Sequence, residues 1–363
     1  MKQKLDSIQA LRAVACLTVF LNHCYIGNVV EWGVSVFFVM SGFLMTLRGL
    51  DDEKELSLSP YQCLRFSWSR IKKLYPLYII TLLPILVLSI AGKLTGRSDE
   101  SFLRILAELV LSLLLIQSWS PKYCMAFNGV AWYLSTAFFL YFCFPFLLRC
   151  ISRYRKKSSA YLAIAALFVL EGVFSFLAPL IGQHFPALVP PDPEASFEMW
   201  FTYIFPPFRL LDFALGCNLA FLFLRRNKAE KKSVINAVDI AVLTVFAVSI
   251  AVYRLIDDMQ GSECCKHAFL FSPTALISVY SFALGKGFLS RLLTNRYTVA
   301  LGDISSSFYL IHQDIIRAML MLWGYTSLPV SVFKAILIPT AFLLTLLASA
   351  LYGRIAERRR KHI

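Results

Sequence analysis

The sequence contains little charge and no long polar segment, and both absences exclude a water-soluble domain. Only 16% of its 363 residues are Asp, Glu, Lys or Arg, whereas 58% are hydrophobic. A soluble chain needs more polar surface than this to cover its core. Because no polar stretch is long enough to fold alone, we expect a single membrane domain over residues 1–363.

Signatures of metal, redox and nucleic-acid chemistry are also missing. The nine cysteines form neither a CxxC pair nor a zinc-ligand spacing, and many lie in apolar runs, where cysteine acts as a small hydrophobe. No cleavable signal peptide is evident, because the first apolar run is too long and lacks a small-residue cleavage site. The net charge of +14 does not indicate nucleic acid, since Lys and Arg gather in cytoplasmic loops of membrane proteins. We expect no metal and no nucleic-acid partner.

What is present is a series of apolar runs of membrane-spanning length. Because basic clusters follow alternate runs, the positive-inside rule predicts an all-α polytopic protein with about ten transmembrane helices and both termini in the cytoplasm. The expected spans are 8–26, 32–47, 74–91, 129–148, 161–181, 201–224, 237–255, 269–284, 298–322 and 332–351. If the run 102–119 also crossed, the basic segment 149–157 would lie outside. We therefore expect 102–119 to be re-entrant or interfacial, with an ordinary crossing as the alternative.

The first of these spans carries Arg12 and His23. Ionisable side chains inside a membrane helix are costly and indicate a functional site. The two residues are 11 positions apart, which is about three helical turns, so they share one face with roughly 16 Å between them along the axis. The alternative is an arginine that extends to the interface and a histidine that only packs.

The second span contains the run GVSVFFVMSGFL, residues 33–44, with Ser41 and Gly42 near its end. Arg12, His23 and this run, in that order, resemble the acyltransferase-3 family of integral membrane O-acyltransferases. The resemblance extends over almost the whole chain. It implies a short form without the hydrolase-like domain that is fused to some members.

A basic group lies where the third span begins, in the segment Arg-Ile-Lys-Lys-Leu-Tyr-Pro that starts at Arg70. An ordinary cytoplasmic anchor would look the same. The resemblance implies that Arg70 and Lys73 bind the phosphates of coenzyme A. The family usually has a second arginine where this sequence has Lys73, which attracts phosphate but lacks the bidentate fork.

A third motif, GDISSSFYLIHQ, starts at residue 302 and also resembles the family. Ser305, Tyr309 and His312 are spaced i, i+4 and i+7, so they share one helical face. Counted from the start of its span, His312 lies roughly 21 Å deep. His23 is similarly deep from the same side, so the two imidazoles are predicted to meet. A structural histidine at a helix contact is the alternative.

Two further stretches supply candidates with two interpretations each. Arg209 and Asp212 are i and i+3, so they form an intrahelical ion pair or bind substrate. Trp132 begins a Trp-x-Leu-Ser stretch, and its ring stacks on a sugar or belongs to the interfacial aromatic belt, which we favour. Many family members have a glutamate soon after this stretch, where the present sequence has Thr136 and Ala137.

Together the motifs predict an O-acyltransferase of the bacterial cytoplasmic (inner) membrane, embedded in membrane lipid. The resemblance implies acyl-CoA, most simply acetyl-CoA, as donor. It implies a sugar hydroxyl of a surface polysaccharide, or of its lipid-linked precursor, as acceptor. His23 would be the general base or a transient acyl carrier, and Arg12 would hold the donor or fix its path along the same helical face. The competing hypotheses are a transporter or flippase of glycan intermediates and a non-catalytic assembly partner.

Overall fold

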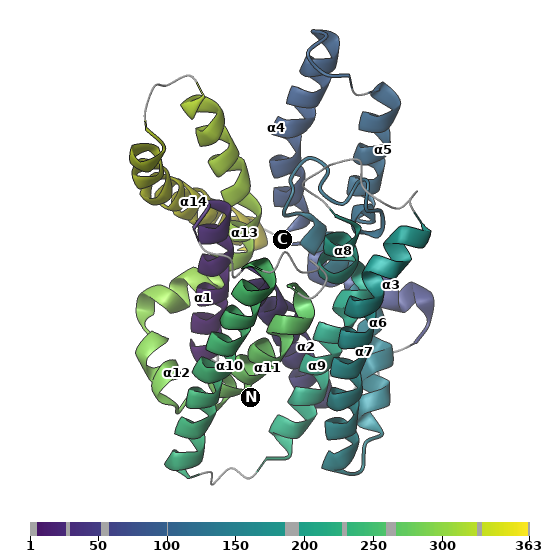
Figure 1. The fold of residues 1–363 in the computed structure, drawn as a ribbon, viewed down its shortest axis with the longest axis vertical. Coiled ribbons are helices and arrows are strands. Elements are labelled where there is room, and N and C mark those ends of the chain that lie inside the picture. Colours follow the sequence, from purple (N-terminus) through teal and green to yellow (C-terminus); the bar gives the residue numbers. More distant parts are fainter. Residues whose placement is uncertain are drawn as a thin grey trace.

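The protein is a bundle of helices, and within the described residues it contains no strand (Figure 1). The computed structural model describes residues 6–26, 30–51, 58–99, 101–185, 196–226, 231–258, 266–324 and 329–361. The helices are α1 Asp6–His23, α2 Val30–Asp51, α3 Pro60–Ile71, α4 Tyr75–Leu94, α5 Phe102–Leu113, α6 Trp132–Ser152, α7 Lys157–His184, α8 Phe197–Met199, α9 Pro206–Leu224, α10 Lys232–Asp258, α11 Ala268–Leu284, α12 Phe288–Leu293, α13 Arg296–Trp323 and α14 Val330–Lys361. A 3₁₀ turn, η1 Gln117–Trp119, follows α5, and a π-helical turn, η3 Trp200–Ile204, precedes α9.

Each apolar run that we expected to cross the membrane lies in a helix. Among the described residues, 7 helical stretches are long and apolar enough to span a bilayer. They correspond to α2, α4, α6, α7, α8 through α9, α10 and α14. Helix α11 is apolar but shorter, and α1 and α13 are too polar to be counted with the seven. The protein is therefore a helical membrane protein, whereas ten crossings and cytoplasmic termini stay predictions.

The run 102–119 does not form one long helix. Helix α5 has 12 residues and rises only about 18 Å, less than the roughly 30 Å of a hydrocarbon core. It lies beside α4 (Figure 1). Tyr75 and Tyr78 at the start of α4 donate hydrogen bonds of 2.9 Å to the carbonyls of Leu113 and Ser112. The segment is thus not a regular spanning helix, and its depth in the membrane stays a prediction.

The centre of the bundle is the crossing of α2 and α9, where the two backbones touch. A Cβ atom at Gly42 would lie 2.1 Å from the carbonyl oxygen of Phe213, and one at Gly216 would lie 1.9 Å from that of Val39. Any side chain at either glycine would therefore force the helices apart. Gly42, a candidate site residue in the sequence, thus serves helix packing.

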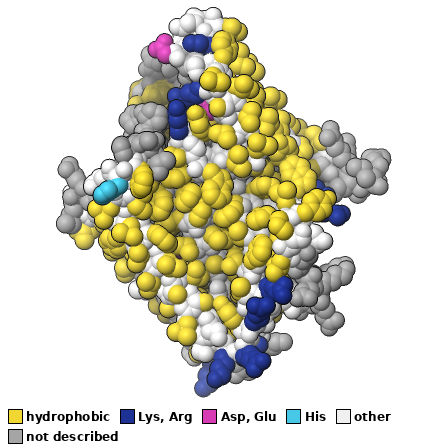
Figure 2. Space-filling model, turned by 90° about the vertical axis from the view of Figure 1, so that its right-hand side faces the viewer, with side chains coloured by type: hydrophobic (Ala, Val, Ile, Leu, Met, Phe, Trp, Pro, Cys, Tyr) yellow, Lys and Arg dark blue, Asp and Glu magenta, His cyan; other side chains and the backbone are white. Residues whose placement is uncertain are grey.

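The outer helices expose apolar side chains, as a lipid-facing surface requires. The stretch over α8 and α9 is 72% buried, whereas those of α4, α7, α10 and α14 are each only 22% buried. Large apolar residues such as Val87 and Phe176 are 61% and 65% exposed. Hydrophobic side chains cover most of the face in Figure 2, and Lys and Arg gather toward its margins. Water would not tolerate an apolar surface of this extent on a monomeric protein, but lipid does.

Candidate active site

Helices α1 and α13 run side by side in the same direction and bring two motifs together. At one end, a Cβ atom on Gly302 would lie 2.1 Å from the carbonyl oxygen of Gln9, so the helices touch there. Farther along, the rings of Phe20 and Phe308 pack edge to face with centroids 5.6 Å apart. This pairing aligns the remaining residues of α1 and α13 turn by turn.

At the far end of this helix pair the two imidazoles meet, as the sequence predicts. His312 Nε2 lies 3.2 Å from His23 Nδ1, and the ring centroids are 5.0 Å apart. His312 is 1% exposed, whereas His23 is half-buried. His312 is thus a hydrogen-bonding histidine at a helix contact, as the alternative interpretation states. The same contact orients His23.

The hydrogen-bond partners assign the tautomers of both rings. His312 Nδ1 lies 2.7 Å from the carbonyl oxygen of Tyr309, which can only accept, so Nδ1 carries the proton and Nε2 a lone pair. His23 Nδ1 faces that lone pair and, at 2.9 Å, the carbonyl oxygen of Val19. It must therefore be the donor. Neutral His23 is left with an unprotonated Nε2, the form that a general base or nucleophile needs.

Nearer the middle of α1, a cavity of about 110 Å³ opens between α1, α2, α6, α13 and the junction of α3 with α4. Its lining combines two arginines, several hydroxyl groups and apolar side chains, and it includes no Asp or Glu. The polar lining residues are Arg12, Ser41, Arg70, Tyr133, Tyr141, Ser305, Ser306 and Tyr309. The cavity therefore suits an anionic or strongly polar group rather than a cation.

The cationic side of the cavity contains more charge than the sequence motifs indicated. Arg48, at the end of α2, repels both Arg12 and Arg70 electrostatically. Partial burial lowers the pKa of Arg70, and the charge of Arg48 lowers this pKa further, although a guanidinium stays protonated in proteins. Arg70 also lies over the ring of Phe66, 4.7 Å from its centroid. Three like charges held near one another favour a ligand that carries negative charge.

Lys73, the expected partner of Arg70, is not in the cavity lining. Its residue is exposed, and its carbonyl accepts a 3.0 Å hydrogen bond from the Tyr352 hydroxyl. Helix α3 ends at Ile71 and α4 begins at Tyr75, so Lys73 lies in the turn between them. Only Arg70 of the expected pair lines the cavity.

Arg12 lines the cavity, and His23 lies in the last turn of the same helix. His23 is not among the lining residues of the cavity. Aromatic rings fill the space between: Tyr309 lies 6.1 Å from Phe37 and 5.3 Å from Tyr133, and its ring centroid is 5.8 Å from that of His312. The ring of Tyr309 therefore lies between the cavity and the histidine pair in this conformation.

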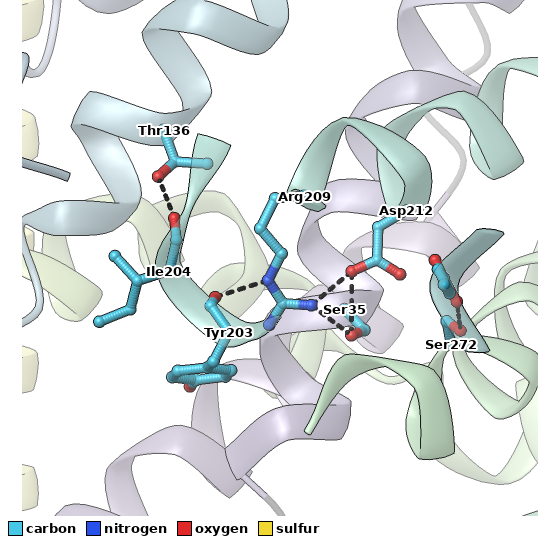
Figure 3. Close-up of polar contacts among 8 residues, drawn as sticks. Ser35, Thr136, Tyr203, Ile204, Arg209, Asp212 and Ser272 are labelled. Carbon is cyan, nitrogen blue, oxygen red and sulfur yellow. Dashed lines mark hydrogen bonds and ion pairs between the residues drawn. The ribbon is translucent and has the colours of Figure 1, made fainter. Parts of the chain in front are cut away.

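Arg209 and Asp212 form the intrahelical ion pair that was one of the two interpretations. Arg209 Nη1 lies 2.6 Å from Asp212 Oδ2, and both side chains are essentially inaccessible. Arg209 also donates to the Tyr203 carbonyl and to Ser35 (Figure 3). Neither residue lines the cavity. The pair therefore has a structural environment, between α2, η3 and α9.

Trp132 is buried inside the protein, at 3% exposure. Its ring packs against Phe38, Tyr133 and Tyr203. The interfacial-belt interpretation is therefore wrong, because such a ring must reach the membrane surface. A buried ring of this kind also has no open face for a sugar.

Sequence reasoning missed Tyr141 and did not separate Tyr133 from its neighbours. Both phenols interact with the Ser41 hydroxyl and lie near the charge of Arg12. Tyr133, Ala137 and Tyr141 are spaced by four residues, so they form one stripe of α6. That spacing was the available signal. Ala137, at the place where many family members were expected to have a glutamate, also lines the cavity.

Comparisons with known proteins agree with one another. A family model described as an acyltransferase domain matches residues 5–354. Acyltransferase MdmB of Streptomyces mycarofaciens is 29% identical over 336 residues, which cover 86% of this chain and 79% of the relative. O-acetyltransferase OatA of Staphylococcus aureus (strain NCTC 8325 / PS 47) is 22% identical over 364 residues, covering 93% of this chain and 55% of the relative.

A putative O-acetyltransferase of Staphylococcus aureus (strain COL) is similar to the same degree, 22% identical over 352 residues, and covers 91% of this chain. The chain spans about half the length of these staphylococcal relatives, at 53% and 55%. No solved structure matches the chain.

Proposed function

Because the chain belongs to the acyltransferase-3 family and is thus a membrane acyltransferase, we propose that it moves an acyl group from acyl-CoA to a sugar hydroxyl. Acetyl-CoA is the simplest donor. The acceptor is a cell-surface polysaccharide or its lipid-linked precursor, and the membrane is the bacterial cytoplasmic (inner) membrane. The observation that carries this proposal is the arrangement of a cationic cavity and a paired, neutral histidine along one helix.

Arg12 and Arg70 hold the donor in this proposal. Coenzyme A carries phosphates, and guanidinium groups bind phosphate oxygens through two parallel hydrogen bonds. Arg70 lies at the exposed side of the cavity and Arg12 deeper within it. Roughly 16 Å of helix separates Arg12 from His23, so the thioester must extend beyond the cavity toward the imidazole. The ring of Tyr309 has to move aside for this step.

His23 acts on the acceptor or on the thioester. As a base, Nε2 takes the proton of the sugar hydroxyl, the oxygen attacks the thioester carbonyl, and the coenzyme A thiolate leaves and recovers a proton. As a carrier, Nε2 itself attacks the thioester carbonyl and the coenzyme A thiolate leaves. The sugar hydroxyl then takes the acyl group from Nε2, and its proton balances the released thiolate. The lone pair of His312 receives the Nδ1 proton of His23 in a hydrogen bond and so stabilises the charge that develops on His23 in both routes.

The test uses the purified protein with labelled acetyl-CoA and membranes from a strain that lacks the gene. The wild-type protein should release coenzyme A and leave alkali-labile label on glycan, and H23A should insert normally but transfer no label. Full transfer by H23A would exclude both roles of the residue. A wild-type protein that releases no coenzyme A would instead favour the transporter.

The two routes are separated by omitting the acceptor. Label that stays on the protein and maps to His23 identifies the carrier. A protein that takes up no label without acceptor, but transfers label once acceptor is added, uses His23 as the base.

A further inference from the structure

Beyond the histidine pair, the last turns of α13 carry polar residues that the proposed mechanism does not use. Gln313, Asp314 and Arg317 follow His312 and are all half-buried. Apolar residues would suffice if this part of α13 only crossed lipid. Ionisable and amide side chains here indicate a polar task.

The loop before α6 holds these side chains in place. Arg317 Nη1 donates to the carbonyl of Phe127 at 2.7 Å, and Phe127 adopts a left-handed conformation with φ of 55°. Asn128 Nδ2 donates to the carbonyl of Leu310 at 2.9 Å. The loop is thus fixed onto α13 directly beside the turn that contains His312.

Glycine at position 129 lets this loop lie against the polar side chains. A Cβ atom there would lie 2.9 Å from Arg317 Nη2 and 3.1 Å from Gln313 Oε1. Any larger residue would push these groups aside. The close approach keeps the amide and the guanidinium side by side.

The same group surrounds His23. The charge of Arg317 acts electrostatically on His23, and Arg317 in turn interacts with Asp314 and Tyr25. Tyr25 follows His23 by two residues, has φ of 60° and is 66% exposed. Lys334 lies 5.8 Å from the centroid of its ring. Arg317 therefore links His23 to a carboxylate and an exposed phenol, and Gln313 lies beside Arg317 at Gly129.

Two oxygens of this group have no hydrogen-bond partner. Gln313 Oε1 and Asp314 Oδ1 are both buried and unpaired. A buried polar atom without a partner destabilises the protein, so such atoms are generally satisfied by water or by a ligand. Two unpaired acceptors beside Arg317 can receive the hydroxyl protons of one ligand while the guanidinium donates to its oxygens.

On the basis of the proposed function, we propose that Gln313, Asp314 and Arg317 form the acceptor subsite, which binds the hydroxyl groups of an uncharged sugar unit beside His23. The carboxylate disfavours an anionic ligand and the guanidinium disfavours a cationic one. Adjacent donors and acceptors match a ring with neighbouring hydroxyls. Tyr25 offers an apolar surface with a polar tip to the same ring.

The test measures acceptor and donor separately. Purified D314N and R317Q are assayed with labelled acetyl-CoA and increasing amounts of membranes from the gene-deletion strain. Because each change replaces a charged hydrogen-bond partner of the sugar with a weaker neutral one, the amount of membranes for half-maximal transfer should rise about tenfold or more. The rate at which water hydrolyses acetyl-CoA and releases coenzyme A, measured without membranes, should stay within about twofold of wild type. R317K keeps the positive charge but loses the planar guanidinium fork, so its half-maximal amount of membranes should lie between those of wild type and R317Q.

Two controls make the result specific. H184Q changes an exposed residue at the end of α7 that is hydrogen-bonded to the Leu180 carbonyl, and it should behave as wild type. R70Q should raise the KM for acetyl-CoA and leave the half-maximal amount of membranes unchanged.

If the amount of membranes for half-maximal transfer is unchanged in both D314N and R317Q while the wild-type protein transfers label normally, the subsite alone is overturned. So would an equal loss of coenzyme A release, which shows a general defect. Failure of the wild-type protein to transfer label would overturn the proposed function and the subsite together.

Discussion

Two arginines inside the bundle have opposite surroundings. Arg209 is 0% exposed, forms an ion pair of 2.6 Å with Asp212 and lies 4.9 Å from the ring centroid of Tyr203. Arg12 is half-buried, and it donates a long hydrogen bond of 3.5 Å to Gln9 Oε1. Asp303 attracts the Arg12 guanidinium electrostatically and Arg48 repels it, and the side chain lines the cavity.

The difference teaches how to separate structural charge from functional charge in a membrane helix. A paired and enclosed guanidinium has its partner within the protein and stabilises one packing arrangement. A guanidinium that faces a cavity and other cations needs a partner from outside. On this comparison we propose that Arg209 serves folding and Arg12 serves ligand binding, and four substitutions test this division.

The largest expected effect is on the Arg12 side of the comparison, in H23A. Loss of a general base reduces transfer by about 10²–10⁴-fold. The melting temperature of the purified protein should change little, because His23 is half-buried and sits at the end of α1. Comparable destabilisation and loss of activity would show that His23 belongs with the structural residues instead.

On the Arg209 side, D212A should unfold the protein more easily without a specific defect in chemistry. Removing one partner of a buried ion pair costs about 3–5 kcal/mol, because the other charge is left uncompensated. Thermal unfolding in detergent and the yield of folded protein measure the loss. The double change R209M/D212L should recover most of the stability. A stable but inactive D212A would place this pair in substrate binding.

A smaller effect is expected for R12Q, which removes a contact to the acyl donor and the electrostatic attraction to the exposed residue Asp303. Charge-assisted hydrogen bonds contribute about 1.5–3 kcal/mol, so the KM for acetyl-CoA should rise about 10- to 100-fold. The melting temperature should stay near that of wild type. If R12Q melts as early as D212A while its KM is unchanged, the division between the two arginines is wrong.

The smallest effect is expected for K73Q. Lys73 is exposed in the turn outside the cavity, and an exposed charge contributes about 0–1 kcal/mol to an interaction. The KM for acetyl-CoA should change by less than about threefold. R70Q is the matched variant, and its larger effect would sharpen the contrast between the two cations. An effect of K73Q equal to that of R70Q would return Lys73 to the donor site.

Local patterns in the sequence predicted the parts that depend on one helix at a time. The apolar runs indicated where helices lie, and equal depth in two spans predicted that His23 and His312 meet. The i, i+3 spacing of Arg209 and Asp212 likewise indicated their ion pair. Each of these inferences needs only the period and rise of a continuous helix.

Features that depend on a break in a helix or on distant partners could not be predicted in this way. Arg70 and Lys73 would point the same way on one continuous helix, but α3 ends between them at Ile71. Trp132 is buried because Phe38 and Tyr203, far away in sequence, pack on it. In the sequence Tyr141 is one aromatic residue among many in an apolar run. Its role depends on Arg12 of α1 and Ser41 of α2, which the fold places beside it.

The direct contact between α2 and α9 at Gly42 and Gly216 restricts which parts of the protein can move. Because the two backbones touch without intervening side chains, the helices have no room to slide past each other. We therefore expect α2 and α9 to move as one rigid unit. The coenzyme A donor that we propose is larger than the resting cavity, so the cavity has to widen elsewhere. Ile71 and Leu74 line it at the short turn between α3 and α4, and we expect the motion that admits this donor to occur there rather than at the centre of the bundle.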